Sequence, residues 1–368
     1  NVVTPHWGMA SFNPHMLILA RESRGLTQAE LSAGADLGQG TLSKYETGML
    51  APSDDAVNSL ASVLAYPAAF FYQPGQTYGF PPFHYRKRKK LSAKALGRIV
   101  AEMNIRRMHV QRLVLSYELK SSRFIPEIDL DEYQGQSPKR PNVEEVARSV
   151  REAWMLPSGP VANMVDLIEE NGGIVIPCAF GSDLIDAMSQ RIDGLPVLFF
   201  INIGAPADRI RHTLAHELAH MVLHTTTFKA DDEMEREADN FAGAFLLPPD
   251  EVRHQLRRFD LRQLANMKAY WKVSMASIAV RAEKLNLITP YQSKMFWIEM
   301  GKLGYRKREP NEPPPETPTK LRRMVDYHRR TLGYSDAEMA DLLCLTAAEF
   351  NAMYSPEPSP RRHLRVVT

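Results

Sequence analysis

The sequence has few cysteines, no long apolar run and almost no net charge. Its 368 residues include only two cysteines, Cys178 and Cys344, which excludes a disulfide framework and a site of four thiolates. No run of about 18 apolar residues that could cross a membrane occurs. Because 45 Lys and Arg face 43 Asp and Glu, the formal charge is +2, which excludes a protein that coats nucleic acid with bulk positive charge. We expect a soluble, cytoplasmic protein with no membrane partner, in which any contact with DNA comes from a local surface.

Proline- and glycine-rich stretches, which interrupt helices, indicate the domain boundaries. We assign a helical domain to residues 1–75, a basic and helical connector to 76–141, a domain with a small sheet to 142–301, a proline-rich linker to 302–319 and a helical C-terminal domain to 320–368. The sheet is expected from strands near 173–177 and 195–203, after a helix over 143–154. The fold class is therefore α+β and mostly helical.

The N-terminal segment has the pattern of three short helices. Thr27 and Glu30 form a predicted capping box at the start of the second helix, and the third covers residues 39–46. If Leu42 and Tyr45 pack inward, the polar side chains of the third helix face outward, where they suit a major groove. Residues 25–31 (GLTQAEL) and 43–48 (SKYETG) resemble the Xre/Cro-type helix-turn-helix repressors. Carried over by position, that resemblance implies that a double-stranded DNA operator is contacted by Gln28, Gln39, Thr41 and Lys44. The alternative is a small helical bundle with a polar face.

Two other segments bear on DNA binding. The run Arg86–Lys90 contains five adjacent cations, which suits either phosphate contacts or an ordinary solvated face. Residues 333–354 align with 25–46 at a constant offset of 308, with apolar positions matched, but the four DNA-facing positions become Asp336, Ala347, Glu349 and Ala352. We therefore predict that the C-terminal repeat serves packing or partner contact and does not read DNA.

The segment 211–224 carries the chemistry. It contains H-E-x-x-H as His216, Glu217 and His220, and a spacing of four places both imidazoles on one face of a helix, where they can bind one zinc ion. Glu217 is then the general base: zinc lowers the pKa of its bound water toward about 7, and Glu217 takes the proton as hydroxide attacks a peptide carbonyl. The alternative is that the histidines make core hydrogen bonds or hold a purely structural metal.

A third zinc ligand is expected from residues 235–242. Glu235 and Asp239 are four apart and share a helix face, so Glu235 can bind zinc while Asp239 accepts a hydrogen bond from a ligand imidazole. Glu237 is rotated by about 200° from Glu235, which excludes it from the same metal. His212 and His224 continue the spacing but drift off the metal face. We predict that His212 is a residue of the helix start or of a pocket, and that His224 is a core residue or a support for a ligand. His212 is also a candidate oxyanion stabiliser.

Residues 142–249 resemble the zinc-peptidase domain of the ImmA/IrrE family. In that family a strand precedes the H-E-x-x-H helix, and a segment E-x-E-A-(N/D)-x-F-A-x-x-L-L-x-P follows; here Phe245 replaces the first leucine of that segment. The resemblance implies a gluzincin-like zinc-peptidase domain that cleaves a repressor-type protein, in a chain fused to an Xre-type domain. The apolar strand at 197–201 could add an extended substrate at its edge or lie inside the sheet.

Two functions remain open at this stage. The first is a DNA-binding zinc metallopeptidase that regulates transcription, including stress responses, by cleaving a repressor or itself. The second is a regulator without enzymatic activity, in which the metallopeptidase-like domain senses a metal or a ligand. The residues that the zinc-peptidase reaction needs are all present, which favours the enzyme: His216, Glu217, His220 and Glu235. The oligomeric state is left open, with a homodimer as one option.

Overall fold

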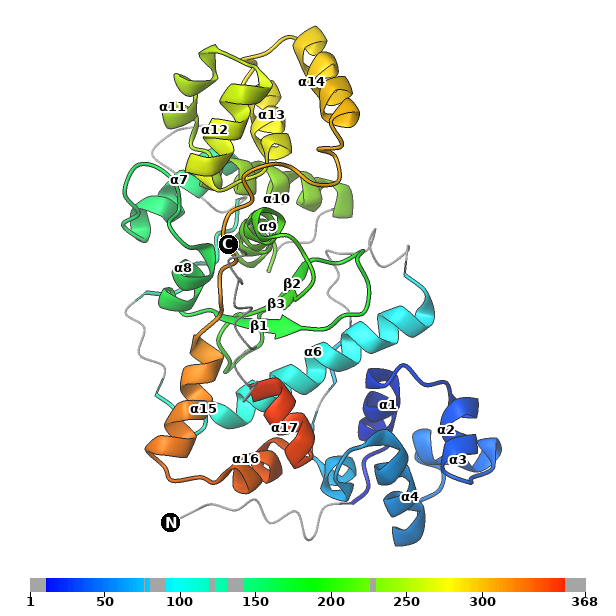
Figure 1. The fold of residues 1–368 in the computed structure, drawn as a ribbon. Coiled ribbons are helices and arrows are strands. Elements are labelled where there is room, and N and C mark those ends of the chain that lie inside the picture. The colour runs from blue at the N-terminus through cyan, green and yellow to red at the C-terminus, as the bar shows by residue number, and fades with distance from the viewer. Residues whose placement is uncertain are drawn as a thin grey trace, which may run out of the picture. The chain divides into compact units, whose positions relative to one another are not determined.

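The computed structural model describes residues 11–75, 77–79, 91–118, 123–130, 142–225 and 230–354 (Figure 1). The basic run 86–90 and the stretch 131–141 lie outside the described residues. Contacts divide the chain into two compact units, one of residues 1–79, 92–118 and 321–368, the other of residues 80–91 and 119–320. No helix in the described part is long and apolar enough to cross a membrane. The fold is mostly helical with one small sheet, which confirms the predicted fold class.

The first unit begins with the predicted helices. They are α1 (Pro14–Ser23), α2 (Gln28–Gly34), α3 (Gln39–Glu46) and α4 (Asp54–Leu64), followed by the 3-10 helix η1 (Ala68–Tyr72) and by α6 (Ala93–Leu113). The capping box of Thr27 and Glu30 is present at the start of α2, as predicted. Leu17, Leu42 and Leu60 are fully buried, α1 packs against α3, and α2 packs against both α3 and α4. The connector helix α6 packs against α1 and thus belongs to this unit.

The C-terminal helices join the same unit. They are α15 (Lys320–Arg330), α16 (Asp336–Leu343) and α17 (Ala347–Tyr354), and the last two begin 308 residues after α2 and α3, as the alignment predicted. Glu349 of α17, which stands where α3 has Thr41, forms an ion pair with Arg24. The Tyr354 hydroxyl lies 2.7 Å from Nδ1 of His109 on α6. The repeat therefore packs on the N-terminal helices, which agrees with the predicted packing role.

The second unit is built around a three-stranded sheet with the order β1-β3-β2. Strand β1 (Ile174–Cys178) runs parallel to β3 (Leu198–Asn202), and β2 (Ala187–Gln190) pairs antiparallel with β3 on its other side. All five residues of β3 are buried, as is usual for a central strand. Because both edges of β3 are occupied, the alternative that this strand adds an extended substrate is wrong.

Helices cover the sheet and place the candidate site. Helix α9 (Ala207–Leu223) packs against β2, and α10 (Asp231–Leu246) packs against both α9 and α7 (Val143–Ala153). The remaining elements are α8 (Met164–Glu170), α11 (Pro249–Val252), η3 (Gln255–Arg257), α12 (Leu261–Trp271), α13 (Met275–Lys284) and α14 (Pro290–Lys302). Phe241 and Phe245 stack one turn apart on α10 and are fully buried, which fixes its packing side.

Residues 303–319, which we call the strap, belong to the second unit and contact its helices. Glu309 accepts hydrogen bonds from the backbone N–H groups of Met275 (2.7 Å) and Ala276 (3.1 Å) at the start of α13, and from Nζ of Lys268 (2.9 Å). Glu316 accepts from the first N–H groups of α8 and forms an ion pair with Arg211 of α9. Carboxylates at helix N-termini are favourable because they meet the positive end of the helix dipole. These two carboxylates thus attach the proline-rich stretch to the starts of α8 and α13.

Candidate metal centre

Helix α9 brings two imidazoles together. His216 and His220 are one turn apart, and their Nε2 atoms lie 3.1 Å from each other. His216 is 6% exposed and His220 fully buried. The helix is apolar around them, since Leu214, Ala215, Leu218 and Ala219 are fully buried. The local sequence thus folds as a buried helix that presents two ring nitrogens at one place.

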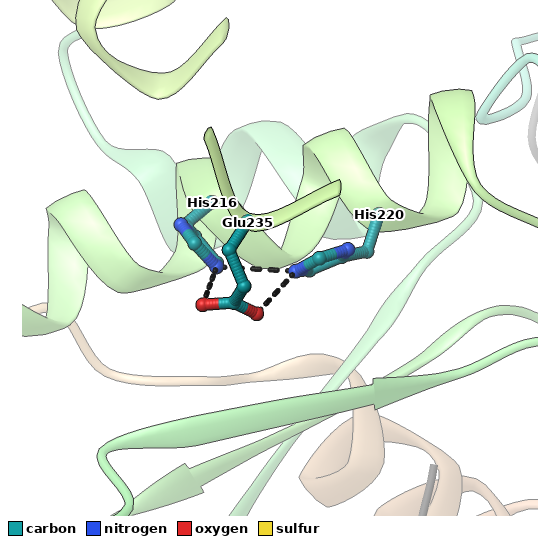
Figure 2. A group of neighbouring side chains, drawn as sticks. All are labelled: His216, His220 and Glu235. Atoms are coloured by element: carbon teal, nitrogen blue, oxygen red, sulfur yellow. Dashed lines mark hydrogen bonds and ion pairs between the residues drawn. The ribbon is translucent and has the colours of Figure 1, made fainter. Parts of the chain in front are cut away.

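Helix α10 adds a carboxylate at the same place (Figure 2). Oε2 of Glu235 lies 3.7 Å from Nε2 of His216, and Oε1 lies 3.4 Å from Nε2 of His220. These three residues form the candidate metal-binding group found in the described part of the chain. Burial raises the pKa of Glu235, but its contacts with both imidazoles outweigh burial and hold the pKa well below its ordinary value.

The donor set fits a zinc ion. Two imidazole nitrogens and one carboxylate oxygen are the ligands of many catalytic zinc sites, with metal–ligand distances of about 2.0–2.1 Å. Tetrahedral donors at that distance are roughly 3.3 Å apart, and the three separations of 3.1, 3.4 and 3.7 Å bracket this value. The side chains therefore need only small movements to surround one ion.

Asp239 contacts the imidazole of His216 at Nδ1, the ring nitrogen that does not face Glu235. Its Oδ1 lies 2.8 Å from Nδ1 of His216, so the carboxylate accepts a hydrogen bond from Nδ1–H, and Nε2 faces Glu235. Burial lowers the pKa of His216, but its contacts with Asp239 and Glu235 and the charge of Glu217 outweigh burial and raise the pKa to about 9. The structure thus places Asp239 where the spacing predicted.

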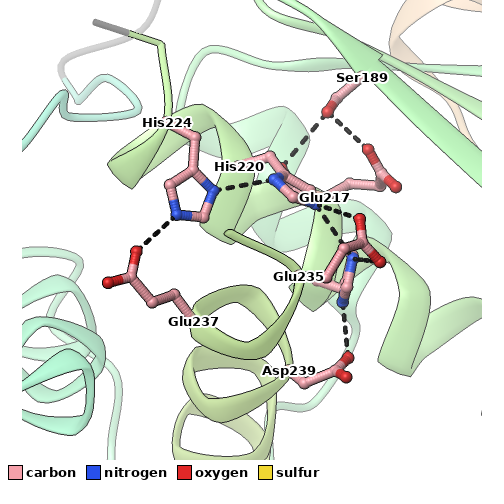
Figure 3. Close-up of polar contacts among 8 residues, drawn as sticks. Ser189, Glu217, His220, His224, Glu235, Glu237 and Asp239 are labelled. Atoms are coloured by element: carbon pink, nitrogen blue, oxygen red, sulfur yellow. Dashed lines mark hydrogen bonds and ion pairs between the residues drawn. The ribbon is translucent and has the colours of Figure 1, made fainter. Parts of the chain in front are cut away.

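A longer chain of contacts supports the second imidazole (Figure 3). Nδ1 of His220 lies 2.9 Å from Nδ1 of His224, and Nε2 of His224 lies 3.0 Å from Oε2 of Glu237. Sequence reasoning assigned Glu237 only a negative role, as a residue that cannot reach the metal. The continued four-residue spacing of His224 was the signal that could have identified this contact.

The carboxylate of Glu217 is held by the sheet. Glu217 is fully buried, and the hydroxyl of Ser189 on β2 donates to its Oε2 at 2.7 Å (Figure 3). Sequence reasoning missed Ser189, because nothing in its local pattern shows that β2 lies beside α9. This contact fixes the orientation of the Glu217 carboxylate, which is not part of the candidate ligand group.

A pocket lies next to the metal centre. Its volume is about 270 Å³, and its lining includes His212 from α9, Asp239 from α10, and Val280 and Lys284 from α13. The structure therefore places His212 at a pocket, one of the roles predicted for it. Gly243 also lines it, and a Cβ there would meet only Cδ of Arg281, at 3.7 Å.

The predicted DNA-facing residues differ in exposure. Gln39 and Lys44 of α3 are exposed, and Thr41 is half-buried. Gln28 is also half-buried, and its Nε2 donates to Glu46 at 2.7 Å. Glu46 in turn forms a two-point ion pair with Arg21, with distances of 2.6 and 3.1 Å. The structure thus leaves Gln39 and Lys44 exposed on α3, and it ties the Gln28 amide to an internal ion pair.

Two domain families match the chain. The model of a peptidase family, described as the IrrE N-terminal-like domain, matches residues 174–283, and a helix-turn-helix model matches residues 17–71. The first match includes all of α9 and α10, and the second includes α2, α3 and α4. The comparison with curated proteins found no match. The matches confirm the predicted fusion of a helix-turn-helix domain with an IrrE/ImmA-like metallopeptidase-like domain.

Proposed function

We propose that this protein is a DNA-binding zinc metalloendopeptidase that regulates transcription by cleaving a repressor-type protein or itself. The convergence of His216, His220 and Glu235, with Glu217 held beside them in the same buried helix, carries the proposal. We place this activity in the cytoplasm, where Cys178 and Cys344, both buried thiols, stay reduced.

The side chains have separate tasks in this reaction. His216, His220 and Glu235 would hold the zinc ion, which when bound polarises a carbonyl and makes water more acidic. Glu217 accepts a proton from the attacking water and returns it to the leaving amine. Ser189 keeps the carboxylate of Glu217 in place through the 2.7 Å hydrogen bond to Oε2.

The first unit directs the enzyme to DNA. The helix-turn-helix family match supports DNA binding, and the exposed Gln39 and Lys44 on α3 are the side chains that we assign to the operator. Gln suits adenine, and Lys suits phosphate or guanine. Attachment to an operator concentrates the peptidase near repressors bound at the same promoter.

Incubation of the zinc-loaded chain with the repressor encoded beside it tests the proposal. We expect cleavage by the wild type and loss of cleavage in Glu217→Gln, a variant of nearly the same shape. Zinc content measured on both proteins provides the control, because Glu217 is outside the ligand group. Equal cleavage by wild type and variant would refute the assigned mechanism.

A regulator without peptidase activity is the second candidate. The pocket of about 270 Å³ beside Asp239 favours it, because a ligand bound there would touch a side chain that supports His216. Zinc-loaded protein that cleaves neither the adjacent repressor nor itself, but changes operator affinity when zinc is removed, would support this candidate.

A further inference from the structure

We propose that His224 and Glu237 form a relay that sets the tautomer of His220 and so prepares Nε2 of His220 to bind the metal. This inference rests on the proposed function, because it gives two residues a role at the same zinc site. It is carried by two contacts in series: 2.9 Å between the Nδ1 atoms of His220 and His224, and 3.0 Å between Nε2 of His224 and Oε2 of Glu237.

The polarity of the relay follows from its last member. A carboxylate only accepts hydrogen bonds, so Nε2 of His224 carries the proton that is donated to Glu237. The proposed relay requires a neutral His224, whose ring has one N–H and one lone pair, so that its Nδ1 atom is an acceptor. The Nδ1 atom of His220 must then donate. Its Nε2 atom keeps the lone pair that a metal requires.

The two ligand imidazoles are thus supported in different ways. Asp239 contacts His216 directly, and the side chain of Asp239 is 54% exposed. The support of His220 is enclosed, since the side chains of His220 and His224 are fully buried and that of Glu237 is only 14% exposed. The opposite tautomer of His220 would leave two lone pairs facing each other at Nδ1, which is costly in a buried site.

The helix geometry explains why one chain segment serves both imidazoles. His216 and His220 lie on α9, and His224 follows at the same spacing of four as its C-cap residue. Glu235, Glu237 and Asp239 lie within five residues on α10. The rotation that keeps Glu237 away from the metal is the same rotation that aims it at His224. Figure 3 shows Glu237 reaching His224, apart from Glu235 and Asp239.

Metal affinity of variants tests the relay. We expect Glu237→Gln to weaken zinc binding about tenfold and His224→Phe to weaken it up to about 100-fold, the usual range for residues that support a ligand. The double variant should bind no more weakly than His224→Phe, because the two side chains act in series. Glu233→Gln, four residues earlier on α10, makes the same charge change and should retain wild-type affinity.

Histidine tautomers in the unaltered chain provide a test without substitutions. The full-length protein, labelled with ¹⁵N-histidine and loaded with zinc, should show His220 protonated at Nδ1 and His224 protonated at Nε2. Protonation of His224 at Nδ1 would overturn the proposal, as would equal zinc affinity of Glu237→Gln and Glu233→Gln. Expected tautomers and affinities in a chain that cleaves nothing would support the relay and refute the peptidase function.

Discussion

Replacement of Glu316 by glutamine tests whether the strap stabilises the unit that bears the metal centre. Glu316 is the ion-pair partner of Arg211, which is 1% exposed and lies five residues before His216 on α9. Its other carboxylate oxygen accepts the backbone N–H groups of Met164 (2.8 Å) and Val165 (3.1 Å). The substitution therefore leaves a buried guanidinium without its counter-charge.

The size of the effect follows from this burial. Removing one partner of a buried ion pair costs about 3–5 kcal/mol. Arg211 keeps its 2.7 Å hydrogen bond to the carbonyl of Val161, and glutamine keeps one oxygen that can accept from α8, so we expect the lower end, about 3 kcal/mol. Glu316→Ala also removes that acceptor and should cost about 4–5 kcal/mol.

Urea denaturation followed by tryptophan fluorescence measures the change. Three of the four tryptophans, at 154, 271 and 297, belong to the second unit and report its unfolding. With a slope of about 3 kcal/mol per molar urea, Glu316→Gln should lower the midpoint by about 1 M. Glu299→Gln makes the same charge change at an exposed position of α14 in the same unit and should change stability by less than about 0.5 kcal/mol. Equal midpoints for the two variants would refute the anchoring role of the strap.

Three further predictions concern the site and the DNA-binding surface. The pKa of His216 is raised to about 9 and a metal binds the neutral ring, so zinc binding should release a proton at neutral pH. The zinc affinity should therefore rise about tenfold per pH unit up to about pH 9. A zinc affinity that does not change with pH in competition titrations would contradict this. Ser189→Ala should slow cleavage about tenfold or more without loss of zinc, because it removes a hydrogen bond to the buried Glu217 carboxylate. A reduced zinc content of this variant would instead indicate that Ser189 has another role. Lys44→Ala should weaken binding to all DNA sequences and lower by about one the slope of log affinity against log salt concentration, whereas Gln39→Ala should relax base preference. Mobility-shift titrations at several salt concentrations measure this slope, and an unchanged slope in Lys44→Ala would show that the assignment fails.

Local patterns predicted much of the architecture. The capping box at Thr27 and Glu30 and the apolar spacing of residues 39–46 depend on neighbours within one or two turns, so the helices of the N-terminal unit were predictable. The offset of 308 identified α16 and α17 for the same reason. Apolar runs also indicated β1 and β3, but β2 has only four residues, and its position beside α9 depends on pairing with β3.

The strap shows where composition misleads. Residues 309–315 contain four prolines and read as a linker, yet Glu309 meets Lys268, which is 1% exposed, and Glu316 meets Arg211. A buried cation needs an opposite charge. The carboxylate nearest in sequence that pairs with Lys268 is 41 residues away, and the one that pairs with Arg211 is 105 residues away. No local pattern contains that information.

The sequence by itself determined which residues can meet on one helix face: His216 with His220, and Glu235 with Asp239. A helix repeats every 3.6 residues, so this choice needs only spacing. The tertiary structure alone decided how α10 crosses α9, and therefore that Glu235 faces both imidazoles, that Glu237 reaches His224 and that Ser189 contacts Glu217. These contacts join separate elements, and their geometry depends on the packing of the buried core between them.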